Sequence, residues 1–172
     1  MKLVAEVMDL YFRLLDTEKD FLPGMPTYEF VLNGLYNFEL YQEAGIIPEI
    51  DRTGLSTVET DVIDNVVGFQ HLSVMNNAIP SIYEQKYIGL SSPMNYIHLQ
   101  YFMVDSEFRG QGVSDKMISK LLDIGEKLSK EVVADVFSDN QFMLNTLSRY
   151  GFSEQSKWSN RHNRELLRLS KN

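Results

Sequence analysis

Residues Tyr96 to Lys120 read YIHLQYFMVDSEFRGQGVSDKMISK, and the rest of the chain is best interpreted outward from this stretch. Its apolar first part, Tyr96 to Val104, predicts a strand buried on both faces, as at the centre of a sheet. Strict alternation would point Tyr96, His98, Gln100, Phe102 and Val104 to one face, and Ile97, Leu99, Tyr101 and Met103 to the other. A glycine-bearing turn and a segment with apolar residues at helical spacing follow.

The turn Arg109-Gly110-Gln111-Gly112-Val113-Ser114 lies between the expected strand and the expected helix. The first backbone N–H groups of a helix have no partner within it, and the aligned peptide dipoles add a partial positive charge there. A phosphate is the natural ligand of such a place. Glycine suits it because a side chain would hold phosphate oxygens away, and because such turns often need positive φ. The alternative is that the glycines serve only the ordinary turn between a strand and a helix, with no ligand.

Two familiar phosphate motifs do not fit this turn. A dinucleotide fingerprint needs a third glycine where Asp115 stands. A phosphate-binding loop needs Gly-Lys-Ser/Thr, whereas Lys116 follows Asp115 and precedes Met117. Both nucleotide folds are therefore excluded.

Composition restricts the function classes. The 172 residues, 44% of them hydrophobic, predict a single domain over residues 1–172. The formal charge of -8 argues against nucleic acid as a partner and is compatible with a cationic small substrate. The absence of cysteine excludes a thiol nucleophile and thiolate metal ligands. With no signal-peptide core and no membrane-length apolar run, we expect a soluble, cytoplasmic protein without a membrane partner.

The rest of the chain predicts an α+β fold, with helices flanking a mixed, mostly antiparallel central sheet. The expected elements are a helix in residues 1–15 (with an edge strand at 2–7 as the alternative), a helix from Thr27 to Gly45, a hairpin of strands 57–63 and 66–74, a short strand at 82–88 within the long connection 75–95, a helix through 113–128, a strand at 132–137, a helix at 139–150, and strands around 156–158 and 165–169.

At the glycine turn the chain resembles the GNAT superfamily of acetyl-coenzyme A dependent N-acetyltransferases. The family's pyrophosphate signature, Gln/Arg-x-x-Gly-x-Gly/Ala after a strand that ends in Val, is similar to the stretch from Val104 to Ser114, where serine replaces the last glycine or alanine. A second motif, an asparagine opening a helix that ends in Gly-Phe, is similar to Asn140 to Phe152. The resemblance covers roughly residues 60 to 155.

The resemblance implies a GNAT-like fold in which residues 1–50 form a helical region on the acceptor side and residues 56–169 form the sheet and cofactor-binding core. It also implies that acetyl-coenzyme A (acetyl-CoA) lies in a V-shaped splay beside the central strand, with no metal. Backbone groups near Phe102, Met103 and Val104 would hold the pantetheine arm, and Asn140 would reach its side. The pyrophosphate would be cradled by Arg109, Gly110, Gln111, Gly112, Val113 and Ser114.

His98 is the candidate general base. An acceptor amine must lose a proton, and an imidazole changes its charge near neutral pH. His98 also lies eleven residues before Arg109, where some members of the family carry a catalytic glutamate or histidine. A buried histidine satisfied by its neighbours is the alternative.

The family's proton donor to the leaving thiolate is often a tyrosine at the position of Leu147, which cannot donate a proton. The expected function is acetyl transfer to a primary amine of a small molecule or peptide by direct attack in a ternary complex. A catalytically weak or regulatory acyl-CoA-binding module is the second hypothesis, and a plain interaction domain is the third. Many members of the family pair, so a homodimer is compatible with the resemblance.

Overall fold

The structure is a computed structural model that describes residues 2–18, 20, 24–45, 47, 52–80, 82, 84–89, 93–160 and 162–171, without the side chains of 16–18 and 87. The elements in chain order are α1 (Lys2–Glu18), α2 (Tyr28–Ala44), β1 (Arg52–Thr60), β2 (Val66–Met75), the π-helical turn η1 (Glu84–Ile88), β3 (Tyr96–Val104), the 3-10 turn η2 (Ser106–Phe108), α3 (Val113–Leu128), β4 (Glu131–Phe137), α4 (Gln141–Arg149), β5 (Ser153–Ser159) and β6 (Glu165–Lys171).

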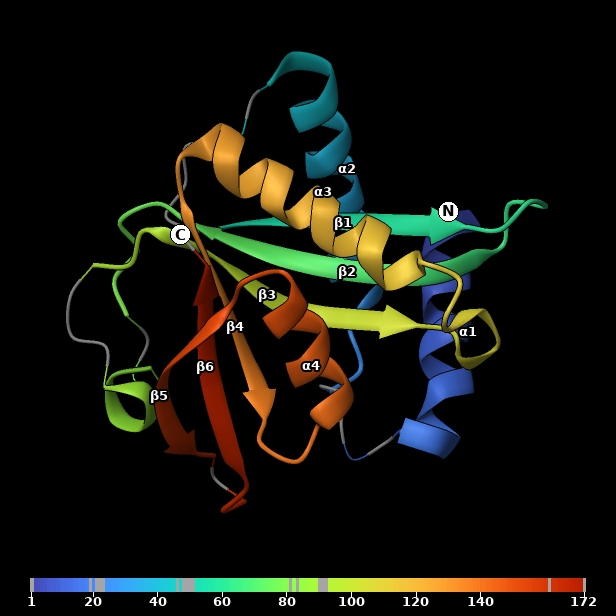
Figure 1. Ribbon diagram of the computed structural model, residues 1–172. Helices are drawn as coiled ribbons and strands as arrows, with labels where there is room; N and C mark the ends of the chain where they lie inside the picture. Colours follow the sequence, from blue (N-terminus) through green and yellow to red (C-terminus); the bar gives the residue numbers. More distant parts are fainter. Residues whose placement is uncertain are drawn as a thin grey trace.

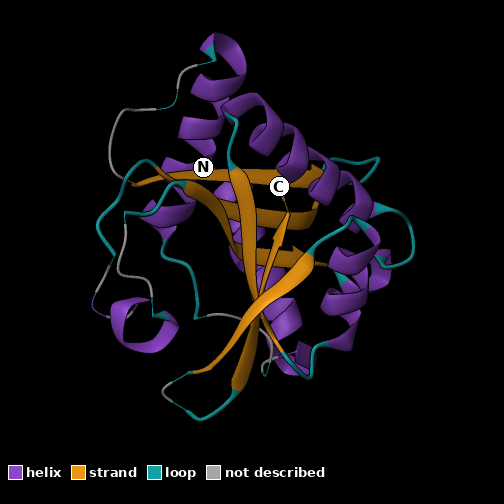
Figure 2. Cartoon of the chain, turned by 60° about the vertical axis from the view of Figure 1, so that its left-hand side comes forward, coloured by secondary structure: helices purple, strands orange, loops and turns teal. Residues whose placement is uncertain are grey.

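The described residues form one six-stranded sheet in the order β1-β2-β3-β4-β6-β5. Only the β3–β4 pair is parallel, and the other neighbours among the described strands are antiparallel. Helices cover the sheet on both faces (Figure 2), with α3 and α4 in front and α1 behind in Figure 1. The predicted α+β class with a mixed, mostly antiparallel sheet is confirmed. Within the described ranges, no helix combines the length and apolar character needed to cross a membrane.

The two N-terminal helices form as their sequence signals predict. The Thr27 hydroxyl accepts a hydrogen bond from the Phe30 N–H at 3.2 Å and caps α2, while Gly45 ends it at φ +66°. In α1 the residues Val7, Leu10 and Leu14 are buried on one face. The alternative of an edge strand at residues 2–7 is therefore wrong.

Two local predictions are wrong. The first strand of the hairpin spans Arg52–Thr60 rather than 57–63, because the Asp61 carboxylate accepts the N–H groups of Ile63 and Asn65, both at 2.9 Å, and closes a turn there. Ile63 is left 72% exposed. Residues 84–88 within the expected short strand form the turn η1 instead.

A β-bulge in β3 changes the predicted facing of its side chains. Register passes from Leu72↔Leu99 to His71↔Tyr101, so Gln100 is the extra residue. One inserted residue reverses which face every later side chain occupies. The core contacts agree. Side chains that pack with α3 and α4 are Ile97, Leu99 and Phe102, whereas Tyr101 and Met103 pack with α1 and α2. His98 therefore lies on the face opposite Phe102 and Val104, and its predicted alignment with them is wrong.

Helix α2 lies close against the first two strands at His71. The Nδ1 atom of the His71 imidazole is 2.7 Å from the Ser56 hydroxyl, and the centroid of this ring is 3.9 Å from that of the Phe30 ring in α2. A Cβ on Gly34 would lie 2.1 Å from Ser56 Oγ, so the helix can approach only because that residue is glycine. Burial lowers the pKa of His71 to about 3. His71 is therefore a neutral core residue at neutral pH.

Candidate functional site

β3 and β4 pair over only part of their lengths. The parallel register joins Tyr96–Leu99 to Glu131–Ala134. Beyond it, β3 runs to Val104 against β2 alone and β4 runs to Phe137 against β6 alone. Figure 1 shows the two strands diverging, with α4 drawn in front of the wedge between them. Among the described strands, none pairs with the β3 edge that faces this wedge after Leu99, so its backbone polar groups can bind an extended ligand there.

The glycine turn adjoins the far end of β3. Gly110 and Gly112 have φ of +74° and +81°, a region that L side chains rarely adopt. A Cβ built on either would meet nothing within 4 Å, so the space beside both residues is open. Gly112 caps α3 without a side-chain hydrogen bond, and the first N–H groups of this 16-residue helix have no helical partner. The turn is thus suited to an anion.

The beginning of the turn is anchored to α1. Arg13 Nη2 lies 2.9 Å from Asp105 Oδ2, and the Asp105 N–H donates to the Val67 carbonyl at 2.9 Å. The other Asp105 oxygen accepts the Glu107 N–H at 3.1 Å. These contacts fix where β3 ends and the turn begins.

The predicted cofactor residues differ in how far their side chains are already used. Arg109 Nη2 lies 3.4 Å from the Val104 carbonyl oxygen, and Gln111 Nε2 donates to the Glu107 carbonyl at 3.0 Å. Asn140 caps α4, its Oδ1 accepting the Met143 N–H at 3.1 Å. Its side-chain amide nitrogen is then the group left to meet a ligand.

His98 makes its contact with β4. Its Nε2 lies 3.2 Å from Asp135 Oδ2, and its side chain is 17% exposed. Asp135 also receives two hydrogen bonds from Arg168 of β6, from Nε to Oδ1 at 2.9 Å and from Nη2 to Oδ2 at 2.7 Å. The indole N–H of Trp158 points to Asp135 Oδ1 at 3.4 Å. Strands β3, β4, β5 and β6 all contribute to this cluster.

Asp135 is a buried carboxylate that remains ionised. Burial raises its pKa, but the hydrogen bonds from His98 and Arg168 and the Arg168 charge outweigh that effect and hold the pKa well below its usual range. Arg168 is itself buried, with an 8% exposed side chain, and its Cζ lies 5.9 Å from the centroid of the Tyr96 ring. At neutral pH the cluster therefore contains a buried ion pair beside an imidazole.

Leu147 and Tyr150 differ sharply in their surroundings. Leu147 is fully buried in the main hydrophobic core and is no proton donor. The Tyr150 hydroxyl donates to Asp115 Oδ1 at 2.7 Å, and this hydrogen bond raises the pKa of Tyr150. Its proton is held by a carboxylate in the first turn of α3.

Asp135, Arg168 and Trp158 were not among the residues predicted from the sequence. A usable signal exists for the first two: Asp135 interrupts the apolar run VVADVF, and Arg168 interrupts LLRL. A charge inside a buried strand is costly unless it is paired. Two such charges in neighbouring strands can neutralise each other. Trp158 offers no comparable signal.

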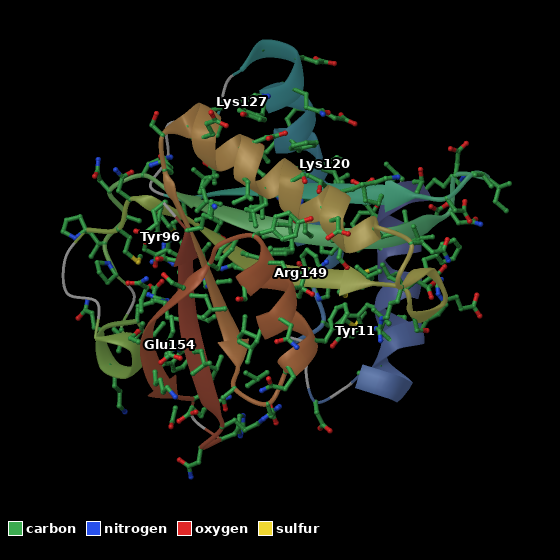
Figure 3. All side chains as sticks on the ribbon, viewed as in Figure 1. Tyr11, Tyr96, Lys120, Lys127, Arg149 and Glu154 are labelled. Carbon is green, nitrogen blue, oxygen red and sulfur yellow. The ribbon has the colours of Figure 1, made fainter. Side chains whose placement is uncertain are left out.

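A separate cavity of about 610 Å³ lies between α2 and α3. The described residues that line it are Phe38, Tyr41, Gln42, Gly45, Lys120, Asp123, Ile124, Lys127 and Leu128. Figure 3 labels Lys120 and Lys127 along α3. None of these belongs to the predicted catalytic or cofactor-binding set. Among the described residues, moreover, no three His, Asp or Glu side chains are grouped so that they could hold a metal ion.

Solved structures share the fold across nearly the whole chain. An N-acetyltransferase from Staphylococcus aureus Mu50 is 13% identical with a TM-score of 0.63, covering 99% of this chain and 93% of its own. The protein yncA from Salmonella typhimurium, assigned to the acetyltransferases and solved with its cofactor acetyl-CoA, is 16% identical with a TM-score of 0.59, covering 98% and 87%. A spermidine N-acetyltransferase mutant from Vibrio cholerae is 16% identical with a TM-score of 0.54, covering 94% and 88%.

The search of curated proteins gives no match. The family model described as the acetyltransferase (GNAT) family matches residues 18–152, which include both the wedge between β3 and β4 and the glycine turn. That match covers most of the chain, and the predicted resemblance is confirmed. The protein belongs to the acetyltransferase (GNAT) family and is an acyltransferase by family.

Proposed function

We propose that the protein transfers the acetyl group of acetyl-CoA to a primary amine of a small molecule or peptide. The observation that carries the proposal is the edge of β3 after Leu99, which no other described strand pairs with on the β4 side and which leads from just beyond His98 to the glycine turn. It offers backbone groups to an extended arm at one end and helix N–H groups to a pyrophosphate at the other. These residues fit acetyl-CoA, the cofactor with which the structural relative from Salmonella typhimurium was solved.

In this proposal the end of β3, the glycine turn and the start of α3 each bind a different part of acetyl-CoA or shape its site. The N–H groups at the start of α3, with Gly112, Val113 and Ser114, bind the pyrophosphate. Gly110 and Gly112 hold the required backbone conformation without a side chain in the way. The backbone of Phe102, Met103 and Val104 orients the pantetheine arm along the wedge.

His98 acts as the general base. Bound acetyl-CoA supplies a thioester whose acetyl carbon gains a C–N bond from the amine as its C–S bond breaks, and the thiolate leaves with the bonding electrons. The imidazole accepts the proton that the amine nitrogen gives up. Because the chain has no cysteine, no acetyl-cysteine intermediate forms and the amine attacks in a ternary complex.

A catalytically weak acyl-CoA-binding module is the second candidate function. The observation that favours it is Leu147, which is fully buried where the resemblance leads one to expect a proton-donating tyrosine. A thiolate is a tolerable leaving group without a proton donor. The first candidate therefore survives the absence of this donor.

Two measurements decide between the candidates. Calorimetric titration of the chain with acetyl-CoA measures binding, and release of free thiol is followed across a panel of polyamines, arylalkylamines and peptides with free N-termini. We expect binding, turnover with at least one amine, and in His98→Gln a turnover that is about 100-fold or more slower but still measurable, with binding retained. Binding with no turnover across the panel supports the weak module instead. Absence of binding contradicts both candidates and leaves a plain interaction domain.

A further inference from the structure

The carboxylate of Asp135 contacts His98 at the narrow end of the wedge between β3 and β4. His98 pairs with Val133 in the parallel register, and the register ends one residue later at Leu99↔Ala134. Asp135 is the first β4 residue after that end, and its Oδ2 still lies 3.2 Å from His98 Nε2. This side-chain contact therefore spans the two strands where their backbones separate.

We propose that Asp135 is a positioning residue which fixes the tautomer of His98, so that Nδ1 is the nitrogen that accepts the proton from the amine. The proposal rests on the proposed function for its chemistry, although the tautomer itself is a property of the free protein. Arg168 of β6 and Trp158 of β5 hold the Asp135 carboxylate in place by donating hydrogen bonds to it from the side away from β3.

The tautomer follows from the hydrogen-bonding capacity of each group. Arg168 donates a hydrogen bond to each oxygen of Asp135, and a guanidinium group cannot accept one. Asp135 therefore acts as the hydrogen-bond acceptor for Arg168. An ionised carboxylate can only accept hydrogen bonds, and so Nε2 must be the nitrogen that carries hydrogen. A neutral imidazole carries one N–H, which leaves the lone pair on Nδ1.

Asp135 also stabilises the positive charge that develops on His98 during the proposed reaction. When Nδ1 takes the proton, the ring becomes an imidazolium with its Nε2–H directed at the Asp135 carboxylate. Among the described residues, the other titratable or charged groups on this side are Tyr96, whose ring centroid is 6.3 Å from that of His98, and Arg168 and Glu84, whose charges act on Tyr96. Because Arg168 is already paired with Asp135, the cluster gains a single charge when His98 is protonated. No described residue forms a hydrogen bond to Nδ1, which remains available to a substrate.

The tautomer can be measured directly by ¹⁵N NMR on labelled protein. The chain has only three histidines, so the His98 signals are assigned by their loss in His98→Gln. We expect the free protein at a pH where His98 is neutral to show a protonated Nε2 and an unprotonated Nδ1. A dominant Nδ1–H form, or rapid averaging of both forms, overturns the proposal. This arm requires no substrate and no Asp135 variant.

Asp135→Asn tests the positioning role. Its amide nitrogen meets an Arg168 donor in either orientation, together with the Trp158 N–H at the Oδ1 position or with the His98 Nε2–H at the Oδ2 position. The imidazole can relieve the second of these conflicts by moving its hydrogen to Nδ1, which favours the orientation with the nitrogen at the Oδ2 position. We expect the Nδ1–H form to increase and kcat to fall about 100-fold, within the range that a positioned base contributes, with KM for acetyl-CoA unchanged. A fall in kcat with an unaltered tautomer would mean that Asp135 is only structural, against the proposal.

The double variant His98→Gln/Asp135→Asn is the matched control. If Asp135 acts through His98, the second substitution has no further effect on kcat in the His98→Gln background. Independent losses that multiply overturn the proposal. Failure of the proposed function is recognised separately, because it removes turnover in the wild-type protein while the NMR result still supports or overturns the tautomer.

Discussion

The Tyr150 hydroxyl lies 2.7 Å from Asp115 Oδ1 and joins the end of α4 to the first turn of α3. Arg149 Nη2, labelled in Figure 3, lies 3.4 Å from the same oxygen. Tyr150 is the nearest tyrosine in sequence to Leu147, so it is the obvious substitute for the missing proton donor. The contact shows that its proton is already engaged by a carboxylate.

Replacement of Tyr150 by phenylalanine should therefore leave catalysis nearly intact. We expect kcat to stay within about threefold of wild type, because a positioned acid would contribute about 100-fold or more. The free energy of unfolding should fall by about 1 kcal/mol for the lost hydrogen bond. Steady-state kinetics and urea unfolding give the two values. A 100-fold loss of kcat with normal acetyl-CoA binding would identify Tyr150 as the acid after all.

Gly112→Ala should weaken acetyl-CoA binding. The residue has φ +81° and no neighbour within 4 Å of an added Cβ, so alanine costs about 1 kcal/mol of conformational strain rather than a clash. We expect a severalfold higher Kd for acetyl-CoA by calorimetry, because relief of the strain distorts the N–H groups of the turn.

Gly45→Ala is the matched control for this experiment. Gly45 has φ +66° with equally open space, but it ends α2 and is not part of the glycine turn. It should lose similar stability and keep the wild-type Kd. Equal losses of affinity in both variants would show that the effect of Gly112→Ala is not local.

Removal of Arg168 should be strongly destabilising. Arg168→Met leaves the buried Asp135 carboxylate without its ion-pair partner, which we expect to cost about 3–5 kcal/mol in urea unfolding at pH 7. Arg168→Met/Asp135→Leu removes both charges and should recover much of that loss. If the double variant is no more stable than the single one, the cost comes from lost packing and not from the unpaired charge.

Stability should fall on mild acidification because of His71. Its pKa is about 3 in the folded protein, below the value near 6.5 in an unfolded chain, so the unfolded state binds more protons between these values. The contribution of His71 is complete above pH 6.5 and is lost as pH falls toward 3. Between pH 7 and pH 5 we expect the free energy of unfolding to drop by about 2 kcal/mol.

The matched variants for this prediction are His71→Asn and His162→Asn. Asparagine places a polar atom near the position of Nδ1, beside the Ser56 hydroxyl, but does not titrate in this range. We expect His71→Asn to lose most of the pH dependence between pH 7 and 5, whatever its absolute stability. His162 is exposed, and its replacement should keep the wild-type slope. An unchanged slope in His71→Asn would contradict the assignment.

The sequence predicts the fold well where a local signal and the tertiary environment agree. β3 and α2 occur within the predicted bounds because apolar pattern, caps and burial all favour them. The strand expected at 57–63 fails because the Asp61 carboxylate closes a turn that β-branched composition does not reveal.

The parts of the site that escape prediction depend on pairing between strands. The bulge at Gln100 exists only relative to β2, so no pattern within β3 reveals it. The Asp135–Arg168 pair needs β6 to lie beside β4, which is a consequence of topology. The position and conformation of the glycine turn, in contrast, were predictable because both depend on local sequence.

The bulge at Gln100 has one more consequence. It divides a single strand into two segments whose side chains use opposite faces of the sheet: His98, before the bulge, lies on the face away from α3, whereas Phe102 and Val104, after it, lie on the face toward α3. In the proposed reaction the first face receives the acceptor and the second the cofactor. Deletion of this residue would leave the composition of the strand almost unchanged and yet exchange the two sides. In the proposed reaction, one insertion in the backbone, and not the identity of the base, therefore decides which reactant His98 can reach.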